Sequence, residues 1–170
     1  MSNQDDDRLK RLWAPWRLDY VKSLRDADER CIFCVPPDES EDRARHIVVR
    51  RPNCIALLNR YPYNNGHLLV APARHVATLV ELGDDEMTAL MRLLRDLVEL
   101  LDQTLGPQGY NIGLNLGRAA GAGILEHLHF HLVPRWAGDT NFMPVTAGAK
   151  VIPESLDALW ELLRSRLAAK

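Results

Sequence analysis

The fold expected of this chain is decided by the stretch Glu126-His127-Leu128-His129-Phe130-His131-Leu132-Val133-Pro134-Arg135. Three of the six histidines alternate here with apolar residues. Successive side chains on a strand point to opposite faces, so the three imidazoles would share one face with about 7 Å between neighbours. A half-exposed strand with histidine on its polar face is the simple alternative. Because imidazoles near pH 7 can donate, accept, bind metal or attack an electrophile, the stretch predicts one chemical face and one core face.

The composition is that of a single domain. The chain has 170 residues, 46% of them hydrophobic, which is enough to bury one sizeable core. A formal net charge of −2 argues against a nucleic-acid-binding surface, so phosphate recognition has to be local. No window approaches the roughly 18 apolar residues of a membrane span, and the acidic residues 1–7 are unlike a signal peptide. We therefore expect a cytoplasmic protein without membrane or nucleic-acid partners.

Two of the three cysteines form the stretch Cys31-Ile32-Phe33-Cys34. Three cysteines make a poor disulfide framework, and in a reducing compartment a CxxC pair indicates a metal or redox site. No thioredoxin-like βαβ pattern surrounds the pair, which disfavours a redox role; a pair of reduced thiols is the remaining alternative. The third cysteine, Cys54, lies in an apolar run and is expected to be a buried thiol.

Apolar periodicity predicts an α+β fold with a mainly antiparallel sheet of about five strands. A long amphipathic helix should pack on the sheet and end at Gly106-Pro107, and a second helix should follow near Pro153. His46, at a strand end, is expected to be a structural residue and not a ligand. The elements expected are strands 46–51, 54–59, 67–71, 110–116 and the histidine stretch, with helices at 84–105 and within 151–169.

The histidine stretch, together with a second segment, resembles the histidine triad (HIT) superfamily of nucleotidyl hydrolases and transferases. The second segment is Leu58-Asn59-Arg60-Tyr61-Pro62-Tyr63-Asn64-Asn65-Gly66-His67-Leu68-Leu69-Val70-Ala71-Pro72. The resemblance implies one HIT-like domain over residues 1–170, with its core at 31–145, a C-terminal helix region at 146–170 and a homodimeric assembly. Residues 1–30 would be a docking arm, because Leu12-Trp13-Ala14-Pro15-Trp16-Arg17 resembles an N-terminal extension of a bacterial branch that includes diadenosine tetraphosphate phosphorylases.

The resemblance also implies a metal site. In the CxxC-bearing members of the superfamily, a histidine three residues after the proline that ends the second segment ligates zinc, and the first histidine of the triad is the fourth ligand. The matching residues here are Cys31, Cys34, His75 and His127. Such a closed Cys₂His₂ set suits one structural Zn²⁺ per chain. His127 would then position the strand and take no part in catalysis.

The remaining triad histidines are the catalytic residues that the resemblance implies. His129 would attack phosphorus and form a covalent nucleotidyl-histidine, and His131 would contact the phosphate. Asn59 is expected at the ribose and His67 near the nucleotide, although a purely structural role remains open for both. Asn115, Gly121 and Gly123, in a loop whose small residues let backbone amides approach an anion, are expected around the phosphate together with His131.

Two departures from the family pattern bear on the reaction. Many hydrolases of the superfamily carry Gln and then Ser or Thr before the triad, where this chain has Gly123 and Ile124. This segment resembles the phosphorylase-containing branch, yet His131 stands where some transferases carry Gln. We expect cleavage of a dinucleoside polyphosphate, such as diadenosine tetraphosphate, with phosphorolysis by orthophosphate slightly favoured over hydrolysis. A nucleoside phosphoramidase and a non-catalytic nucleotide-binding or sensor module are the alternatives.

Overall fold

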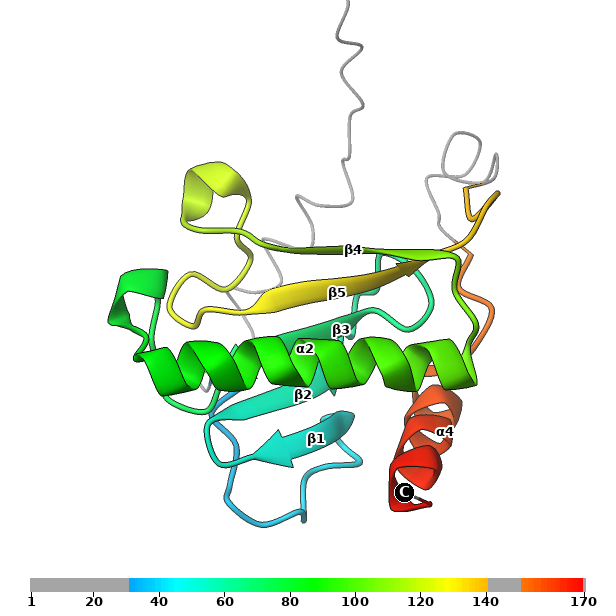
Figure 1. Cartoon of the computed structure of the whole chain (residues 1–170), viewed down its shortest axis with the longest axis horizontal. Coiled ribbons are helices and arrows are strands. Elements are labelled where there is room, and N and C mark those ends of the chain that lie inside the picture. The colour runs from blue at the N-terminus through cyan, green and yellow to red at the C-terminus, as the bar shows by residue number, and fades with distance from the viewer. Residues whose placement is uncertain (1–30, 141–150, 170) are drawn as a thin grey trace, which may run out of the picture.

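The computed structural model describes residues 31–140 and 151–169. Its centre is a five-stranded antiparallel sheet in the order β1-β2-β3-β5-β4, with one long helix across one face (Figure 1). The strands are β1 (Ile47–Arg51), β2 (Cys54–Leu58), β3 (Leu68–Pro72), β4 (Gly109–Leu114) and β5 (Phe130–Arg135). The predicted α+β fold is therefore confirmed. The expected docking arm, residues 1–30, lies outside the described residues.

The two predicted helices are also present. They are α2 (Asp84–Thr104) and α4 (Leu156–Ala168), and short 3₁₀ turns occur at η1 (Leu79–Glu81) and η2 (Arg118–Ala120). Helix α4 begins later than the expected Pro153, because the Ser155 side chain accepts a hydrogen bond from the Ala158 amide and caps the helix there. None of the helices in these described ranges is long and apolar enough to cross a membrane.

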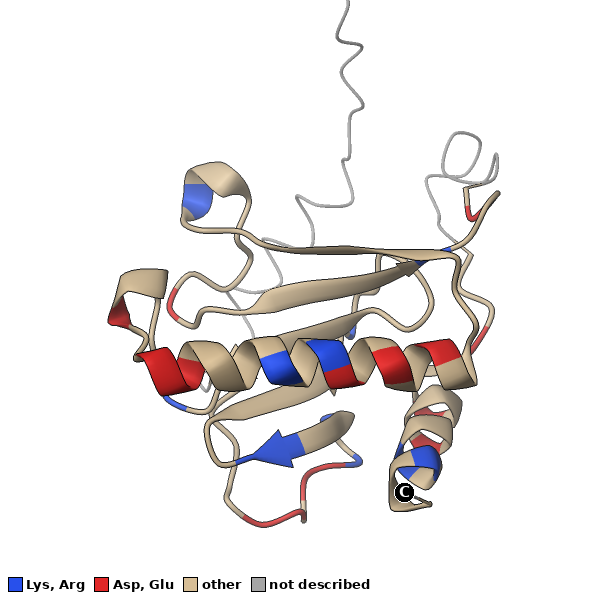
Figure 2. Ribbon diagram, in the orientation of Figure 1, with Lys and Arg blue, Asp and Glu red and all other residues tan. Residues whose placement is uncertain are grey.

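Helix α2 buries the apolar stripe that its sequence predicts. Its six buried leucines pack on β2, β3 and β5. Acidic and basic residues recur along the rest of the helix, as the colours of Figure 2 show. Three acidic residues in the first turn stabilise its amino end through the helix dipole. The buried leucines are Leu90, Leu93, Leu94, Leu97, Leu100 and Leu101. This layer supports one face of the sheet and leaves the other for chemistry.

The opposite face of the sheet carries a second, smaller apolar cluster. It includes Phe33 from the CxxC segment together with Ile55, Leu57 and Leu69 from β2 and β3. Leu69 is paired in register with His131 of β5, and residues paired across an antiparallel ladder share a face. The face away from α2 therefore holds both this cluster and the triad histidine of β5.

The prediction of a strand through all three triad histidines was wrong for the first two. Strand β5 begins at Phe130, so only His131 lies in the ladder. The preceding segment is held differently, because the Leu128 amide donates to the Val76 carbonyl, outside any strand, at 2.7 Å. The backbone of His127 therefore does not follow the strand, and its side chain can approach groups that lie past the start of β5.

Gly66 is required by the loop that leads into β3. Its φ of +74° is strained for an L side chain, and a Cβ atom there would lie 2.7 Å from Leu105 Cδ1. This glycine lets the loop close tightly against the end of α2. The next residue, His67, is thus delivered to the beginning of β3.

Two further predictions about single residues are confirmed. Cys54 is fully buried, with its Sγ 3.7 Å from the Ala89 carbonyl oxygen. His46 is structural, since its Nε2 lies 2.7 Å from Asp157 Oδ1 and joins the start of β1 to α4. Neither residue belongs to the cluster of possible metal ligands in the described chain.

Candidate functional site

His129 is held as a neutral imidazole whose Nε2 keeps its lone pair. Its Nδ1 lies 2.9 Å from the carbonyl oxygen of His127. A carbonyl can only accept, so Nδ1 carries the proton and donates it to this bond. The side chain is buried, and burial lowers the pKa of His129 below its ordinary value. Nε2 is therefore unprotonated and suited to attack an electrophile.

The protonation of His67 is fixed by the loop that precedes it. The Tyr63 backbone N–H donates to His67 Nδ1 at 3.0 Å, and the Asn59 Nδ2 amide lies 3.2 Å from the same nitrogen. A backbone N–H can only donate, so Nδ1 is the acceptor and the His67 proton sits on Nε2. Burial, followed by the neighbouring His131 and His129, lowers the pKa of His67 to about 3. His67 is accordingly neutral.

His67 in turn orients His131. His67 Nε2 lies 3.0 Å from His131 Nδ1 and, because it carries the proton, donates to it. In neutral His131 the proton is therefore on Nε2. The rings of His129 and His131 are 5.0 Å apart between centroids. The site places a nitrogen lone pair beside an N–H donor, which is what nucleophilic attack on a phosphate with stabilisation of its oxygens requires.

Two aromatic residues that the sequence interpretation did not assign to the site contact these histidines. The Phe33 ring is almost fully buried and lies 4.9 Å from the His127 ring and 5.2 Å from the His129 ring. Tyr63 stacks on His131 at 5.6 Å with an interplanar angle of 17°. The sequence carries only a weak signal for each of them. Phe33 lies inside the CxxC motif, and Tyr63 precedes His67 by four positions.

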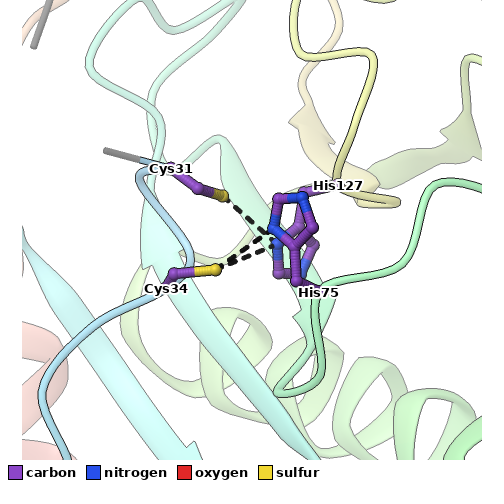
Figure 3. A group of neighbouring side chains, drawn as sticks. All are labelled: Cys31, Cys34, His75 and His127. Carbon is purple, nitrogen blue, oxygen red and sulfur yellow. Dashed lines mark hydrogen bonds between the residues drawn. The ribbon is translucent and has the colours of Figure 1, made fainter. Parts of the chain in front are cut away.

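The four predicted metal ligands come together from three separate segments. Cys31 and Cys34 approach His75 and His127 from the segment before β1, as Figure 3 shows. Cys31 Sγ lies 3.2 Å from His127 Nδ1, and Cys34 Sγ lies 3.2 Å from His75 Nδ1 and 3.8 Å from His127 Nδ1. All four ligand atoms lie within 4.8 Å of one another. The cluster suits a metal site.

The geometry of this cluster fits a four-coordinate ion. Zinc bonds of about 2.3 Å to sulfur and about 2.0 Å to nitrogen separate tetrahedral ligand atoms by roughly 3.3–3.8 Å. The three sulfur–nitrogen distances of 3.2, 3.2 and 3.8 Å are close to this range. His127 Nε2 lies 2.9 Å from the Pro72 carbonyl oxygen, so it carries the proton and leaves Nδ1 to the ion. Burial and the adjacent Cys31 raise the pKa of Cys34 to about 11. A bound cation would stabilise the thiolates.

The other predicted nucleotide-binding residues lie in varied settings. Asn59 is buried, and its Oδ1 accepts from the Tyr61 amide at 3.0 Å, which is the turn-stabilising role left open by the sequence. Asn115 is half-buried just after β4. Gly121, with φ of +83°, donates its N–H to the Arg118 carbonyl at 3.0 Å, so this amide is occupied by the turn. Gly123 is half-buried and its amide has no such bond within the described ranges.

We predict that the pKa of His67 makes the protein less stable in acid. Its pKa is near 6.5 in an unfolded chain and about 3 in the folded protein, so the unfolded state binds the proton first. The stabilisation is complete above pH 6.5 and is lost as pH falls towards 3. At pH 4 the loss should be on the order of 3 kcal/mol. Urea denaturation of the wild type and His67→Gln should show a shallower pH dependence for the variant; equal slopes would contradict the assignment.

The chain is similar to known proteins over most of its length. The HIT domain model matches residues 40–138. The chain is 40% identical over 168 residues to the AP-4-A phosphorylase of Mycobacterium tuberculosis, covering 95% of this chain and 86% of the relative. It is 30% identical to the adenosine 5′-monophosphoramidase hnt1 of Schizosaccharomyces pombe, covering 66% and 81%. A Zn-bound histidine triad family protein from Mycobacterium smegmatis has a TM-score of 0.59 at 21% identity, covering 89% and 93%. The chain therefore belongs to the HIT domain family.

Proposed function

We propose that this protein is a nucleotidyltransferase that cleaves dinucleoside polyphosphates, such as diadenosine tetraphosphate, through a covalent nucleotidyl-His129 intermediate. The observation that carries the proposal is the bond from His129 Nδ1 to the His127 carbonyl, since it directs a lone pair on Nε2 away from the backbone. The similarity to AP-4-A phosphorylase over most of the chain supports this substrate class.

The first step transfers the nucleotide to the protein. His129 Nε2 attacks the α-phosphorus, a P–N bond forms, and the P–O bond to the remaining nucleotide breaks. The N–H at His131 Nε2, placed there by the bond from His67, donates a hydrogen bond towards the phosphate and stabilises the negative charge that develops on its oxygens and on the leaving oxygen. Diadenosine tetraphosphate would thus give adenylyl-His129 and ATP.

The second step transfers the nucleotide to an acceptor. Orthophosphate attack breaks the P–N bond, returns the electron pair to His129 and gives ADP, whereas water gives AMP. We favour phosphorolysis slightly for two reasons. Gly123 and Ile124 offer no side-chain contact of the kind that Gln and Ser or Thr would give, and a relative that matches 95% of the chain is named a phosphorylase.

The proposed nucleotide contacts surround this reacting centre. Asn59 and His67 would lie towards the nucleoside, with the second N–H of the Asn59 amide available to the ribose while the first faces His67. Asn115, Gly123 and His131 would lie around the phosphate. Gly121 would act there through its left-handed turn, since its own amide donates to Arg118.

A phosphoramidase acting on a nucleoside 5′-phosphoramidate is the second candidate function. The specific support is the 30% identity to the hnt1 monophosphoramidase over 113 aligned residues. The same two histidines would serve, with ammonia as the leaving group and water as the acceptor. A nucleotide sensor without turnover is a poorer fit, because it has no use for a histidine held with a nucleophilic nitrogen.

The metal that we propose for the cysteine–histidine cluster is one structural Zn²⁺ per chain. Cys31, Cys34, His75 and His127 supply two sulfur and two nitrogen donors, the set that favours a closed zinc site over an open catalytic one. Bound there, zinc would tie the segment before β1 to the residues that precede the nucleophile. Since such thiolates must stay reduced, the cytoplasm is the proposed location.

We further propose a homodimer that pairs the β4 edges of two copies. Strand β4 is hydrogen-bonded only to β5 in the described chain, so its outer edge presents backbone donors and acceptors, and its Ile112 is 48% exposed. Pairing of two such edges about a twofold axis would give these backbone donors and acceptors partners in the second copy and would cover both Ile112 side chains.

The activity is tested by incubating the protein with diadenosine tetraphosphate, with and without orthophosphate, and separating the products by ion exchange. ADP plus ATP that appear only with orthophosphate are expected; AMP plus ATP regardless of orthophosphate would make the protein a hydrolase. His129→Asn should retain nucleotide binding and lose at least 10²-fold in kcat. Turnover that survives this substitution would exclude the covalent mechanism.

Zinc binding is tested by elemental analysis of protein purified without chelator. We expect about one zinc per chain in the wild type and a lower content in Cys31→Ser. Because the proposed site is structural, Cys31→Ser should lower the Tm clearly and change kcat little. Cys54→Ala, which removes the cysteine outside the cluster, is the control and should keep its zinc. A content near zero in the wild type would end the proposal.

The dimer is tested by light scattering. The wild type should have twice the mass of the chain, and Ile112→Lys should shift it towards the monomer because a charge is introduced at the paired edge. Met91→Lys changes an equally exposed apolar residue on α2 and should leave the mass unchanged. A monomeric wild type would refute the assembly.

A further inference from the structure

We infer that Gly113 is a specificity-determining residue: its missing side chain keeps open, beside His131, the space that the leaving nucleotide of a dinucleoside polyphosphate occupies. The inference rests on the proposed function and deepens it, because it concerns the half of the substrate that departs and not the half that His129 takes.

The fold itself gives no reason for glycine at this position. Gly113 lies within β4 and is not among the residues with positive φ. Among residues 31–140 and 151–169, nothing lies within 4 Å of a Cβ atom built on Gly113. Glycine inside a strand is destabilising relative to alanine, and where it occurs it often marks close approach of a ligand or of another backbone. The reason for glycine at position 113 therefore lies in a group that is not among the described residues.

The register of the sheet places this gap next to His131. Gly113 is paired with His131 across the β4–β5 ladder, so a side chain there would share the face of the imidazole, with Cβ atoms about 4.5–5.5 Å apart. On the other side of His131, the partner in β3 is Leu69, which is buried in the cluster that contains Phe33. The side chain of Leu69 thus fills the β3 side of His131, whereas on the β4 side Gly113 has no side chain. We call this β4 side of His131 the open flank.

The chemistry assigns an occupant to the open flank. In an in-line displacement the leaving group lies opposite the attacking nitrogen, and in a dinucleoside polyphosphate it is a whole nucleotide. This bulk cannot lie over Leu69 without displacing the apolar cluster, whereas no atom of the described residues lies within 4 Å of a Cβ built on Gly113. A small leaving group such as ammonia would need no such space.

The chain offers a matched control for this role. Gly109 lies on the same strand and the same face, is paired with Arg135, and likewise has nothing within 4 Å of a built Cβ. It stands four residues from Gly113, well away from His131. Each variant replaces a glycine of β4 by the same β-branched residue, but only Gly113→Val narrows the space beside His131.

The experiment compares Gly113→Val and Gly109→Val in cleavage of diadenosine tetraphosphate and in inhibition by AMP, which lacks a leaving nucleotide. Gly113→Val should lower kcat/KM at least tenfold while the inhibition constant of AMP stays within twofold; Gly109→Val should change neither. Gly113→Ala should show a smaller loss in the same direction, and it serves if the valine variant does not fold. Light scattering on each variant reports the assembly.

Each other outcome overturns the inference. Unchanged cleavage by Gly113→Val would show that the space is not used, and an equal loss of AMP affinity would show a general defect of the site. A change of mass in Gly113→Val alone would mean that a second copy occupies the gap. If the wild type cleaves nothing, the proposed function fails separately, and Gly113 is then tested by calorimetry: equal weakening of AMP and tetraphosphate binding, or of neither, would refute its role.

Discussion

The candidate active site depends on the placement of one residue, His127. Its carbonyl oxygen lies 2.9 Å from Nδ1 of His129, the proposed nucleophile. Its Nε2 donates to the Pro72 carbonyl at the end of β3, and its Nδ1 faces the two CxxC thiols. Each of its hydrogen-bonding groups has a different task. An ion bound at the cluster would therefore fix the residue whose backbone carbonyl sets the tautomer of His129. The proposed metal site and the proposed catalytic site are thus joined through His127.

The second constraint is the division of the sheet into two faces. Helix α2 and its leucines fill one face, which makes the strands rigid supports, and the triad histidine of β5 projects from the other. On that second face, hydrogen bonds run from the loop before β3 through His67 to His131. The Tyr63 N–H can only donate, so it fixes the tautomer of His67, and the His67 N–H in turn fixes the tautomer of His131. The proton of neutral His131 therefore lies on Nε2, and no charged group is needed to place it there.

The sequence was sufficient for most of the fold and for the residue types of the site. Alternation and the apolar stripe of α2 placed five strands and two helices to within a few residues, since these patterns reflect burial directly. It failed at residues 127–129, where alternation continues but the segment bonds to Val76 and leaves the ladder. It also left out Phe33 and Tyr63, because aromatic contacts between segments distant in sequence have no periodic signature.

What the sequence by itself determined is the chemistry available: a triad, a CxxC pair and a further histidine, and a resemblance that assigned them to nucleotide transfer and to a metal. What only the tertiary structure decided is the state and direction of each group. The tautomers of His129, His67 and His131 follow from which carbonyls and amides the fold brings within 3 Å, and the open flank at Gly113 follows from strand register. Hydrogen-bond direction and free space are properties of neighbours in three dimensions, and a linear pattern does not contain them.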